Sequence, residues 1–228
     1  MLPQVEDENS TRKLAETLAL AGYTHVGLTI PTGLMQDRVK QLQHLFHEAG
    51  IEAATRVDLN STSRHELLRH LRRFRGSYDI VSVKCANPNV ATVACRDRRV
   101  DVIFFELGNN RVRFSHSLAN MLHGTFEFNL TPVLISKSQG TVLSRTAKEA
   151  SIAREHGTKI VLSSGCTSLS MVRSPLQIAS VASAFGFSPE QSRLGVSEVP
   201  FTLIERNVFR RSSEYVEEGV RVVVPRAG

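Results

Sequence analysis

The stretch TKIVLSSGCTSLSMVRSP, residues 158–175, contains a strand, a loop and a helix start in immediate succession. The β-branched and apolar residues at 159–162 predict a strand, and the Ser-Ser-Gly turn that follows predicts its end. Ser174 and Pro175 predict a helix start, because serine caps free backbone N–H groups and proline at the first helical position loses no hydrogen bond. The segment therefore indicates one β-loop-α unit of an α/β protein.

The loop of this unit has the chemistry of an anion site. In α/β proteins, ligands bind where the carboxyl ends of strands meet the amino ends of helices. The loop offers hydroxyl groups, free N–H groups and one cation, Arg173, which together suit an anionic ligand. An ordinary strand-to-helix connection explains the same residues, so both interpretations stay open at this point.

The rest of the chain repeats the alternation of strands and helices. Two capping-box pairs, Ser63 with Glu66 and Thr146 with Glu149, mark helix starts between the strands. The predicted strands are Leu2–Val5, His25–Ile30, Glu52–Asp58, Ile80–Val83, Val100–Phe105, Phe126–Leu130, Lys159–Leu162 and Gly195–Ser197. Strict alternation predicts a parallel sheet, and this many strands in about 200 residues favours a TIM-like (β/α) barrel over a doubly wound sheet. We expect one barrel domain at residues 1–207 and a charged tail at 208–228.

Composition limits the possible functions. An apolar content of 41% supports a folded core, and the absence of an 18-residue apolar run predicts no membrane span. The amino-terminal residues lack a secretory pattern, and the widely spaced Cys85, Cys95 and Cys166 form no CxxC pair, so we expect a reduced, cytoplasmic compartment. Lys and Arg number 28 against 22 Asp and Glu, a net charge of +6. This arginine-rich balance favours an anionic polymer as partner, although solvated helix faces carry such charge too.

Motifs for catalysis and for metal binding are missing from the sequence. Metal hydrolases on barrels often carry an early His-x-His, which none of the 8 histidines forms, and no GxSxG, Walker loop or GxGxxG occurs. We therefore expect no catalytic residue and no metal or cofactor site in this chain. Two alternatives remain: a metal-dependent phosphoesterase with an atypical ligand set, and a phosphosugar-type enzyme that uses Lys84 as a Schiff-base lysine.

Cations that follow predicted strands form the main candidate site. In a barrel these segments share one face, where the cations would give a broad positive surface. The first group is Lys84, Arg111, Arg113, Lys137 and Arg173, with His116 just inside a helix start. A second group, Arg96, Arg98 and Arg99, precedes a strand and is expected at the opposite rim. Each residue alone is also explained as a solvated charge.

Four segments together resemble a known family. They are RRVDVIFF (98–105), FSHSLANML (114–122), KIVLSSG…VRSP (159–175) and FGFSPEQSRLGVSEVPFTLIERN (185–207). By their order and spacing, the chain resembles the ribonuclease P protein component 3 family, the thirty-kilodalton subunits of archaeal and eukaryotic ribonuclease P. Residues 1–5 depart from the aromatic-Asp-Leu strand with which family members often begin, and the tail after Asn207 has no counterpart.

The resemblance implies an irregular TIM-like barrel that lacks the ligands of related metal hydrolases. It also implies a protein cofactor in 5′-leader removal from precursor tRNA, with magnesium on the RNA and no cofactor on the protein itself. The implied partners are ribonuclease P RNA, protein component 2 and the other ribonuclease P protein subunits, with precursor tRNA contacted indirectly and no membrane. His116 and Arg173 are the two positions that the resemblance carries over.

The sequence thus predicts an RNA-binding, non-catalytic subunit of a tRNA-processing ribonucleoprotein. Arg173 and Lys84 are the expected phosphate contacts, and His116 is expected to hydrogen-bond a phosphate or the adjacent loop. The apolar segments Leu118–Leu122 and Val199–Ile204 either supply a surface for the partner subunit or lie in the core.

Overall fold

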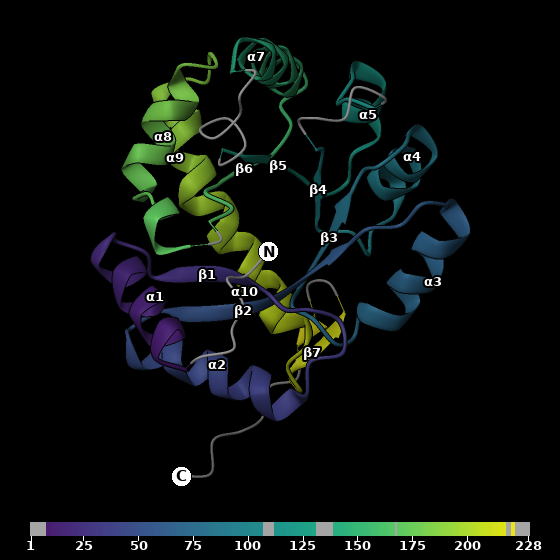
Figure 1. The fold of residues 1–228 in the computed structure, drawn as a ribbon. Coiled ribbons are helices and arrows are strands. Elements are labelled where there is room, and N and C mark those ends of the chain that lie inside the picture. The colour runs from purple at the N-terminus through teal and green to yellow at the C-terminus, as the bar shows by residue number, and fades with distance from the viewer. Residues whose placement is uncertain (1–7, 107–111, 131–138, 167, 218–219, 222–228) are drawn as a thin grey trace.

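The computed structural model describes residues 8–106, 112–130, 139–166, 168–217 and 220–221, and its centre is one curled sheet of six parallel strands (Figure 1). The strands lie side by side in chain order, so each βα unit adds one strand next to the last. They are β1 (His25–Thr29), β2 (Glu52–Leu59), β3 (Ile80–Lys84), β4 (Val102–Phe104), β5 (Thr125–Asn129) and β6 (Ile160–Ser163). This order confirms the predicted irregular, TIM-like α/β architecture.

Helices lie on the outer side of the curled sheet, one before β1 and the others between successive strands (Figure 1). They are α1 (Glu8–Leu20), α2 (Gln36–Glu48), α3 (Arg64–Phe74), α4 (Pro88–Arg96), α5 (His116–Met121) and α7 (Gln139–Glu155). Each buries an apolar stripe against the strands, as Leu67 and Leu71 of α3 do in one cluster with Val81 of β3. This burial between sheet and helices forms the main core.

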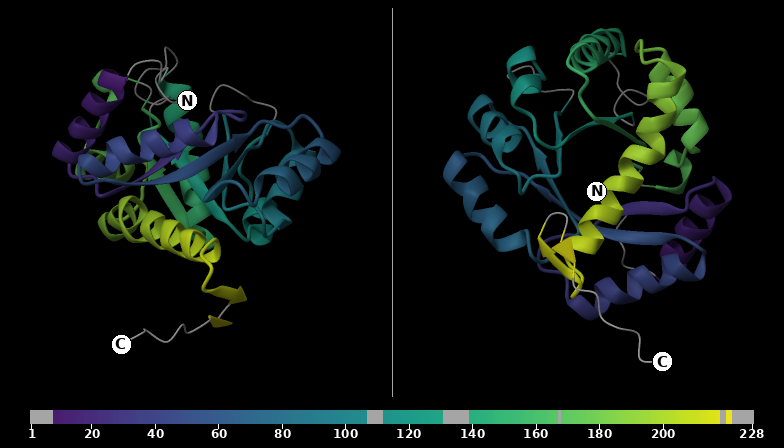
Figure 2. Two further views of the ribbon diagram at one scale, coloured as in Figure 1. Left: turned by 90° about the horizontal axis from the view of Figure 1, so that it is seen from below. Right: turned by 180° about the vertical axis from the view of Figure 1, so that it is seen from behind.

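The sheet is not closed into a full barrel. Among the described strands, β1 and β6 are the edges and do not pair with each other. The short helix η1 (Leu169–Met171) and then α8 (Pro175–Ser183), α9 (Pro189–Val196) and α10 (Glu198–Arg210) follow β6. α10 crosses the open end of the curled sheet, and the antiparallel pair β7 (Tyr215–Glu217) and β8 (Val220–Arg221) lies beyond it (Figure 2).

The predicted helix starts are partly confirmed. The Ser174 hydroxyl accepts a hydrogen bond from the backbone N–H of Gln177, and the Gln177 side-chain oxygen accepts one from the backbone N–H of Ser174, so a capping box is formed here. Ser63 caps α3, but the Glu66 carboxylate accepts from Thr62 instead of from Ser63. α7 begins at residue 139, so the capping pair predicted at 146 and 149 is wrong and lies in mid-helix. Those two side chains bond one turn back, to the Val142 carbonyl and to Arg145.

Other predicted boundaries differ from the structure or lie outside the described residues. The predicted strand Gly195–Ser197 is wrong, because these residues end α9 and start α10. A Cβ atom at Gly195 would lie 3.0 Å from Cγ of Leu162, so the missing side chain lets α9 pack directly on β6. The predicted strand Leu2–Val5 lies outside the described residues, and α10 continues past Asn207, where the tail was predicted to begin.

α10 covers the amino-terminal end of the strands with both apolar and charged contacts. Leu203 and Ile204 are buried in one cluster with the first residues of β3 and β4 and with Ala54 of β2. Arg206 Nη2 lies 3.4 Å from Oδ1 of Asp101, just before β4, and Arg211 pairs with the aspartate just before β3. These pairs fix the helix across the sheet's open end.

Asp101 is the centre of this arrangement, which leads to a stability prediction. Its carboxylate is 1% exposed and accepts hydrogen bonds from Val81 N (2.8 Å) and from Arg75. Asp101→Ala leaves the buried Val81 N–H without its acceptor and removes the buried carboxylate that pairs with Arg75, so we expect the free energy of unfolding in urea to fall by about 3–5 kcal/mol. Arg206→Ala removes a side chain that is 45% exposed and should cost about 1 kcal/mol or less. Equal losses in the two variants would contradict this account.

Candidate functional site

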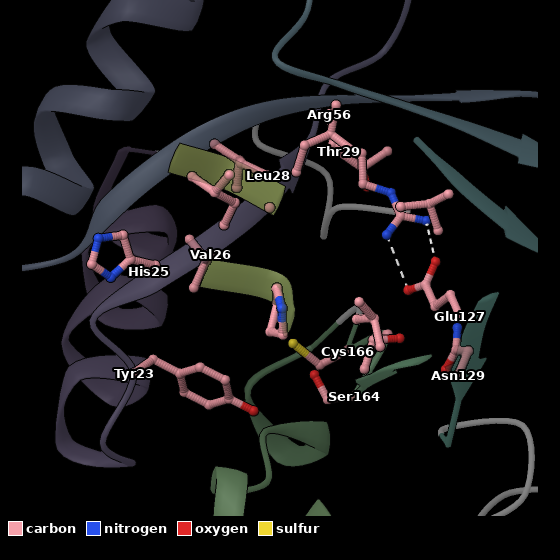
Figure 3. A pocket seen from close by; sticks show the side chains of 18 of the residues that line it. Tyr23, His25, Val26, Leu28, Thr29, Arg56, Glu127, Asn129, Ser164 and Cys166 are labelled. Atoms are coloured by element: carbon pink, nitrogen blue, oxygen red, sulfur yellow. Dashed lines mark hydrogen bonds and ion pairs between the residues drawn. The ribbon is translucent and has the colours of Figure 1, made fainter. Parts of the chain in front are cut away.

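The strands enclose a cavity of about 250 Å³ between β1, β2, β5 and β6 (Figure 3). Strand alternation directs every second side chain inward, and on β2 and β5 several of these are charged or polar. They include Arg56, Asp58, Glu127 and Asn129. The turn after β6 closes one side, and Gly165 has a φ of +53° with Asn129 so close that a Cβ atom would clash.

Arg56 is at the centre of a hydrogen-bonded network inside the sheet. Its Nη1 and Nη2 donate to the two carboxylate oxygens of Glu127 at 3.0 and 2.6 Å, and Nε donates to Asp58 Oδ1 at 2.6 Å. Nη2 also donates to Ser82 Oγ at 3.1 Å. Figure 3 shows Arg56 and Glu127 facing each other across the interior. The two-pronged contact ties β2 to β5, two strands that are not neighbours in the sheet.

The electrostatics of the network keep its groups charged. Burial alone would raise the pKa of Glu127, but the adjacent Arg56 guanidinium outweighs burial and holds that pKa below its ordinary value. Burial would likewise lower the pKa of Arg56, but the charges of Glu127 and Asp58 raise it. Both carboxylates thus accept hydrogen bonds from one guanidinium, and the arrangement serves to hold strands together.

The described parts of the chain contain no group of three or more His, Cys, Asp or Glu side chains that could hold a metal ion. Nor is any of their helices long and apolar enough to span a membrane. The buried thiols do not suggest chemistry either, because burial raises the pKa of Cys85 well above its ordinary value and that of Cys95 to about 12.

At the open side of the cavity, between β1 and β6, side chains at the start of β1 contact the loop after β6 and α10. The Tyr23 hydroxyl donates to the Arg173 carbonyl oxygen at 2.8 Å, and burial raises the pKa of Tyr23 to about 12. The ring of His25 meets that of Phe201 in α10 edge-on, at 4.9 Å between centroids. The loop that contains Arg173 therefore packs across the gap toward the start of β1.

The predicted loop cations have individual contacts. Lys84 ends β3, and its Nζ lies 3.0 Å from Oε2 of Glu106, so an ion pair accounts for it. Nη1 of Arg173 donates to the carbonyls of Ser170 and Val172 at 2.9 and 2.8 Å. Arg113 is exposed and has no ion pair within the described ranges. Arg111 and Lys137 lie outside the described residues.

His116 does not share the carboxyl-terminal face of the strands, so that expectation is wrong. Its Nδ1 lies 2.9 Å from His156 Nε2 and 3.8 Å from Oε2 of Glu155, and both partners lie where α7 ends, shortly before β6 begins. The chain reaches this point because Arg145 in mid-α7 binds the Val112 carbonyl, which directs the following residues along α7.

The second predicted group lies at the amino-terminal rim, as expected. Arg96 ends α4 and its Nε lies 3.0 Å from Met121 Sδ, whereas Arg99 makes a two-pronged contact with Asp97 at 2.9 and 2.6 Å. Arg98 is exposed and has no ion pair in the described part of the chain. The predicted cations therefore do not converge on one face.

Sequence reasoning missed the interior network. The available signal was the charged pair at positions 56 and 58, two residues apart and so on one face of a strand, matched by Glu127 between phenylalanines on β5. Charges inside a buried strand need partners, which indicates an internal pairing.

The sequence and the fold both have close counterparts among known proteins. Residues 2–212 match the family described as RNase P subunit p30. The chain is 25% identical to ribonuclease P protein component 3 of Methanothermobacter thermautotrophicus, with 96% of this chain and 93% of that protein covered. It is 25% identical to the protein of the same name from Halobacterium salinarum, with 95% and 93% covered.

Among solved structures, one chain of the cryo-EM structure of archaeal ribonuclease P with mature tRNA superposes with a TM-score of 0.84 at 14% identity. The superposition covers 95% of this chain and 96% of that one, and it shows that the two share a fold.

The low pKa of Glu127 predicts how stability depends on pH. A carboxyl whose pKa is lower folded than unfolded stabilises the protein above its unfolded pKa, about 4.3, and this contribution is lost as the pH falls through the folded value. Urea unfolding from pH 6 to pH 3 should therefore give a shallower acid decline for Glu127→Gln than for the unchanged chain. The control Glu52→Gln, at a side chain 65% exposed, should follow the unchanged chain. Superimposable slopes for Glu127→Gln and the unchanged chain would refute the prediction.

Proposed function

Because the chain belongs to the RNase P subunit p30 family, we propose that it is a protein subunit of ribonuclease P that supports the catalytic RNA in removing the 5′ leader of precursor tRNA. The observation that carries this proposal is the family match over residues 2–212, which spans every strand of the sheet. The relatives of similar length bear the name ribonuclease P protein component 3.

The structural features fit a supporting role for this subunit. Both carboxylates in the cavity are bound to Arg56, so neither is a free general base. The chain carries a net charge of +6, which suits a polyanionic partner. Within the proposal, the RNA holds the catalytic magnesium, and the protein neutralises phosphates and so favours the compact form of the RNA.

The proposed RNA contacts differ in how available their charges are. Arg98 and Arg113 are exposed and have no ion pair in the described residues, although the charge of Arg113 also acts on Glu149. Arg173 has one terminal nitrogen bonded to carbonyls and retains its other donors, and Lys84 would have to share its charge with Glu106. Three further candidates are less available for phosphate contacts because each already has a partner. They are His116, Arg96 and Arg99.

The proposed partners are ribonuclease P RNA, protein component 2 and the other protein subunits of the enzyme, in the cytoplasm. Of the two apolar segments expected either to form a partner surface or to lie in the core, Leu118, Leu203 and Ile204 are buried, whereas the remaining residues are partly or fully exposed. Phe201, Val208 and Phe209 of α10 remain 45, 46 and 38% exposed, and this side of α10 is our candidate for protein contact.

Reconstitution tests the proposed function. Cleavage of precursor tRNA by the cognate ribonuclease P RNA, together with protein component 2, should proceed at lower magnesium when this protein is added. The protein alone should hydrolyse neither precursor tRNA nor a simple phosphodiester with added manganese. Cleavage that is indifferent to the protein at every magnesium concentration, or turnover by the protein alone that chelation abolishes, would contradict the proposal. The second outcome would favour a phosphoesterase.

Arg173 gives a residue-level test. Arg173→Ala should weaken binding to ribonuclease P RNA and reduce the slope of log affinity against log salt by about 0.7–0.9, the value of one phosphate contact. Arg173→Lys, which keeps the charge, should preserve most of the slope. If the alanine variant retains the full slope and affinity, Arg173 is not an RNA contact.

A further inference from the structure

α3 carries a row of basic side chains on its outer face. His65, Arg69, Arg72 and Arg73 are all exposed. Their spacing of four, three and one residues puts them on one side of the helix, opposite its two buried leucines. At 1.5 Å per residue, this α3 row extends about 12 Å along the helix. In Figure 1 and Figure 2, α3 lies at the outside of the barrel and its outer side is uncovered by other drawn elements.

The charges of the α3 row are largely unneutralised. The one acidic residue of α3 is Glu66, whose carboxylate accepts hydrogen bonds from the backbone N and Oγ1 of Thr62, both at 2.8 Å. These hydrogen bonds, and to a smaller extent the charge of Arg69, lower the pKa of Glu66. The ionised Glu66 carboxylate therefore offsets part of the charge of one basic side chain in the row. No ion pair joins the row to a carboxylate within the described ranges. By contrast, Arg12 of α1 pairs with Glu48 at 2.7 Å.

Arg98 extends the α3 row at its carboxyl-terminal end. Arg75, which follows α3, donates from Nη1 to the Arg99 carbonyl oxygen at 3.3 Å, so the loop after α4 lies against the end of α3. Arg98 is exposed in that loop. Helix-dipole stabilisation explains cations in the last turn, such as Arg72 and Arg73, but it does not explain Arg69 at mid-helix or Arg98 on a neighbouring loop.

We propose that the α3 row together with Arg98 binds the phosphate backbone of a double-helical segment of ribonuclease P RNA. This inference rests on the function proposed above and names a surface for it. Arginines three or four residues apart on a helix lie about 5–6 Å from one another at Cβ, so they can meet successive phosphates with planar, two-pronged donors. Double-helical RNA offers mainly phosphates, sugar hydroxyls and shape to such a surface.

The composition of the surface distinguishes RNA from an acidic protein as the occupant. Protein interfaces have an apolar core with a polar rim. None of the exposed large apolar side chains of the described residues lies on α3, whereas several lie on α10. A purely cationic face without an apolar centre matches the polar, positively charged character of nucleic-acid interfaces.

A charge-matched comparison in the full chain tests this surface. The variant Arg69→Gln, Arg72→Gln, Arg73→Gln removes three charges from the α3 row. The control variant Lys13→Gln, Lys40→Gln, Arg193→Gln removes from α1, α2 and α9 three exposed charges that have no ion pair within the described residues. Binding to ribonuclease P RNA is measured against salt for both, and circular dichroism and urea unfolding establish that both fold. A third variant replaces the same three arginines by lysine.

The α3 variant should lower the slope of log affinity against log salt by about 2, at 0.7–0.9 per phosphate contact, and should weaken binding at least tenfold at low salt. The control should change the slope much less, and the lysine variant should retain most of it. Equal losses in the α3 variant and the control would mean that net charge alone matters, which overturns the proposal.

The same data separate failure of this inference from failure of the proposed function. If the unchanged chain does not bind ribonuclease P RNA even at low salt, the proposed function fails. If it binds and the α3 variant binds equally well, only the α3 surface is refuted. Normal RNA binding by the α3 variant together with loss of reconstituted cleavage would assign α3 to an acidic protein partner, which also refutes the RNA assignment.

Discussion

Within the described residues no strand pairs with the outer edges of β1 and β6, and this is the constraint on which the rest of the structure depends. A closed parallel barrel satisfies every strand edge by pairing, but six strands that stop short of closure leave two rows of backbone groups and an open interior. The chain solves this with other elements. α9 packs on β6 through Gly195, Tyr23 binds the Arg173 carbonyl across the gap, and α10 covers the end of the strands.

The charged side chains in the interior of the sheet are likewise bound to other parts of the chain. In barrel enzymes the space above the strands presents unsatisfied polar groups to a substrate. Here Arg56 binds both Glu127 and Asp58, so the charges of the interior serve one another and link non-adjacent strands. The two carboxylates of the cavity are thus committed to internal pairing, whereas exposed cations such as Arg69 and Arg98 lie on an outer helix and on a loop.

The sequence was sufficient for the architecture because local signals agreed with one another. The patterns of the six central strands and the helix start at Ser174 and Pro175 depend on neighbours in the chain, and the structure confirms them. The errors arose where distant contacts decide. Gly195 is helical because Leu162 lies beneath it, and α7 starts before Thr146 because its buried side chains pair within the helix.

The candidate site was less predictable, for a related reason. Chain position places Lys84 at a strand end, but it does not reveal Glu106 beside it or the carbonyls that engage Arg173. His116 follows a predicted strand in the sequence, but in the structure it contacts His156 near the opposite rim. The residues from Val112 onward run along α7 before α5 begins. The sign of each charge follows from the sequence, but whether a charged side chain is free to bind a ligand depends on neighbours that only the fold brings together.

The attachment of α10 has a consequence for how the protein is made. Asp79 and Asp101 precede β3 and β4, but the arginines that pair with them, Arg211 and Arg206, are synthesised 132 and 105 residues later. Until then these carboxylates lack part of their counter-charge, and the apolar ends of β3 and β4 lack their cover. The sheet can therefore assemble early in translation, but its lower end is finished only after residues 198–211 have emerged. The fold is therefore complete only in a nascent chain that has been synthesised through α10.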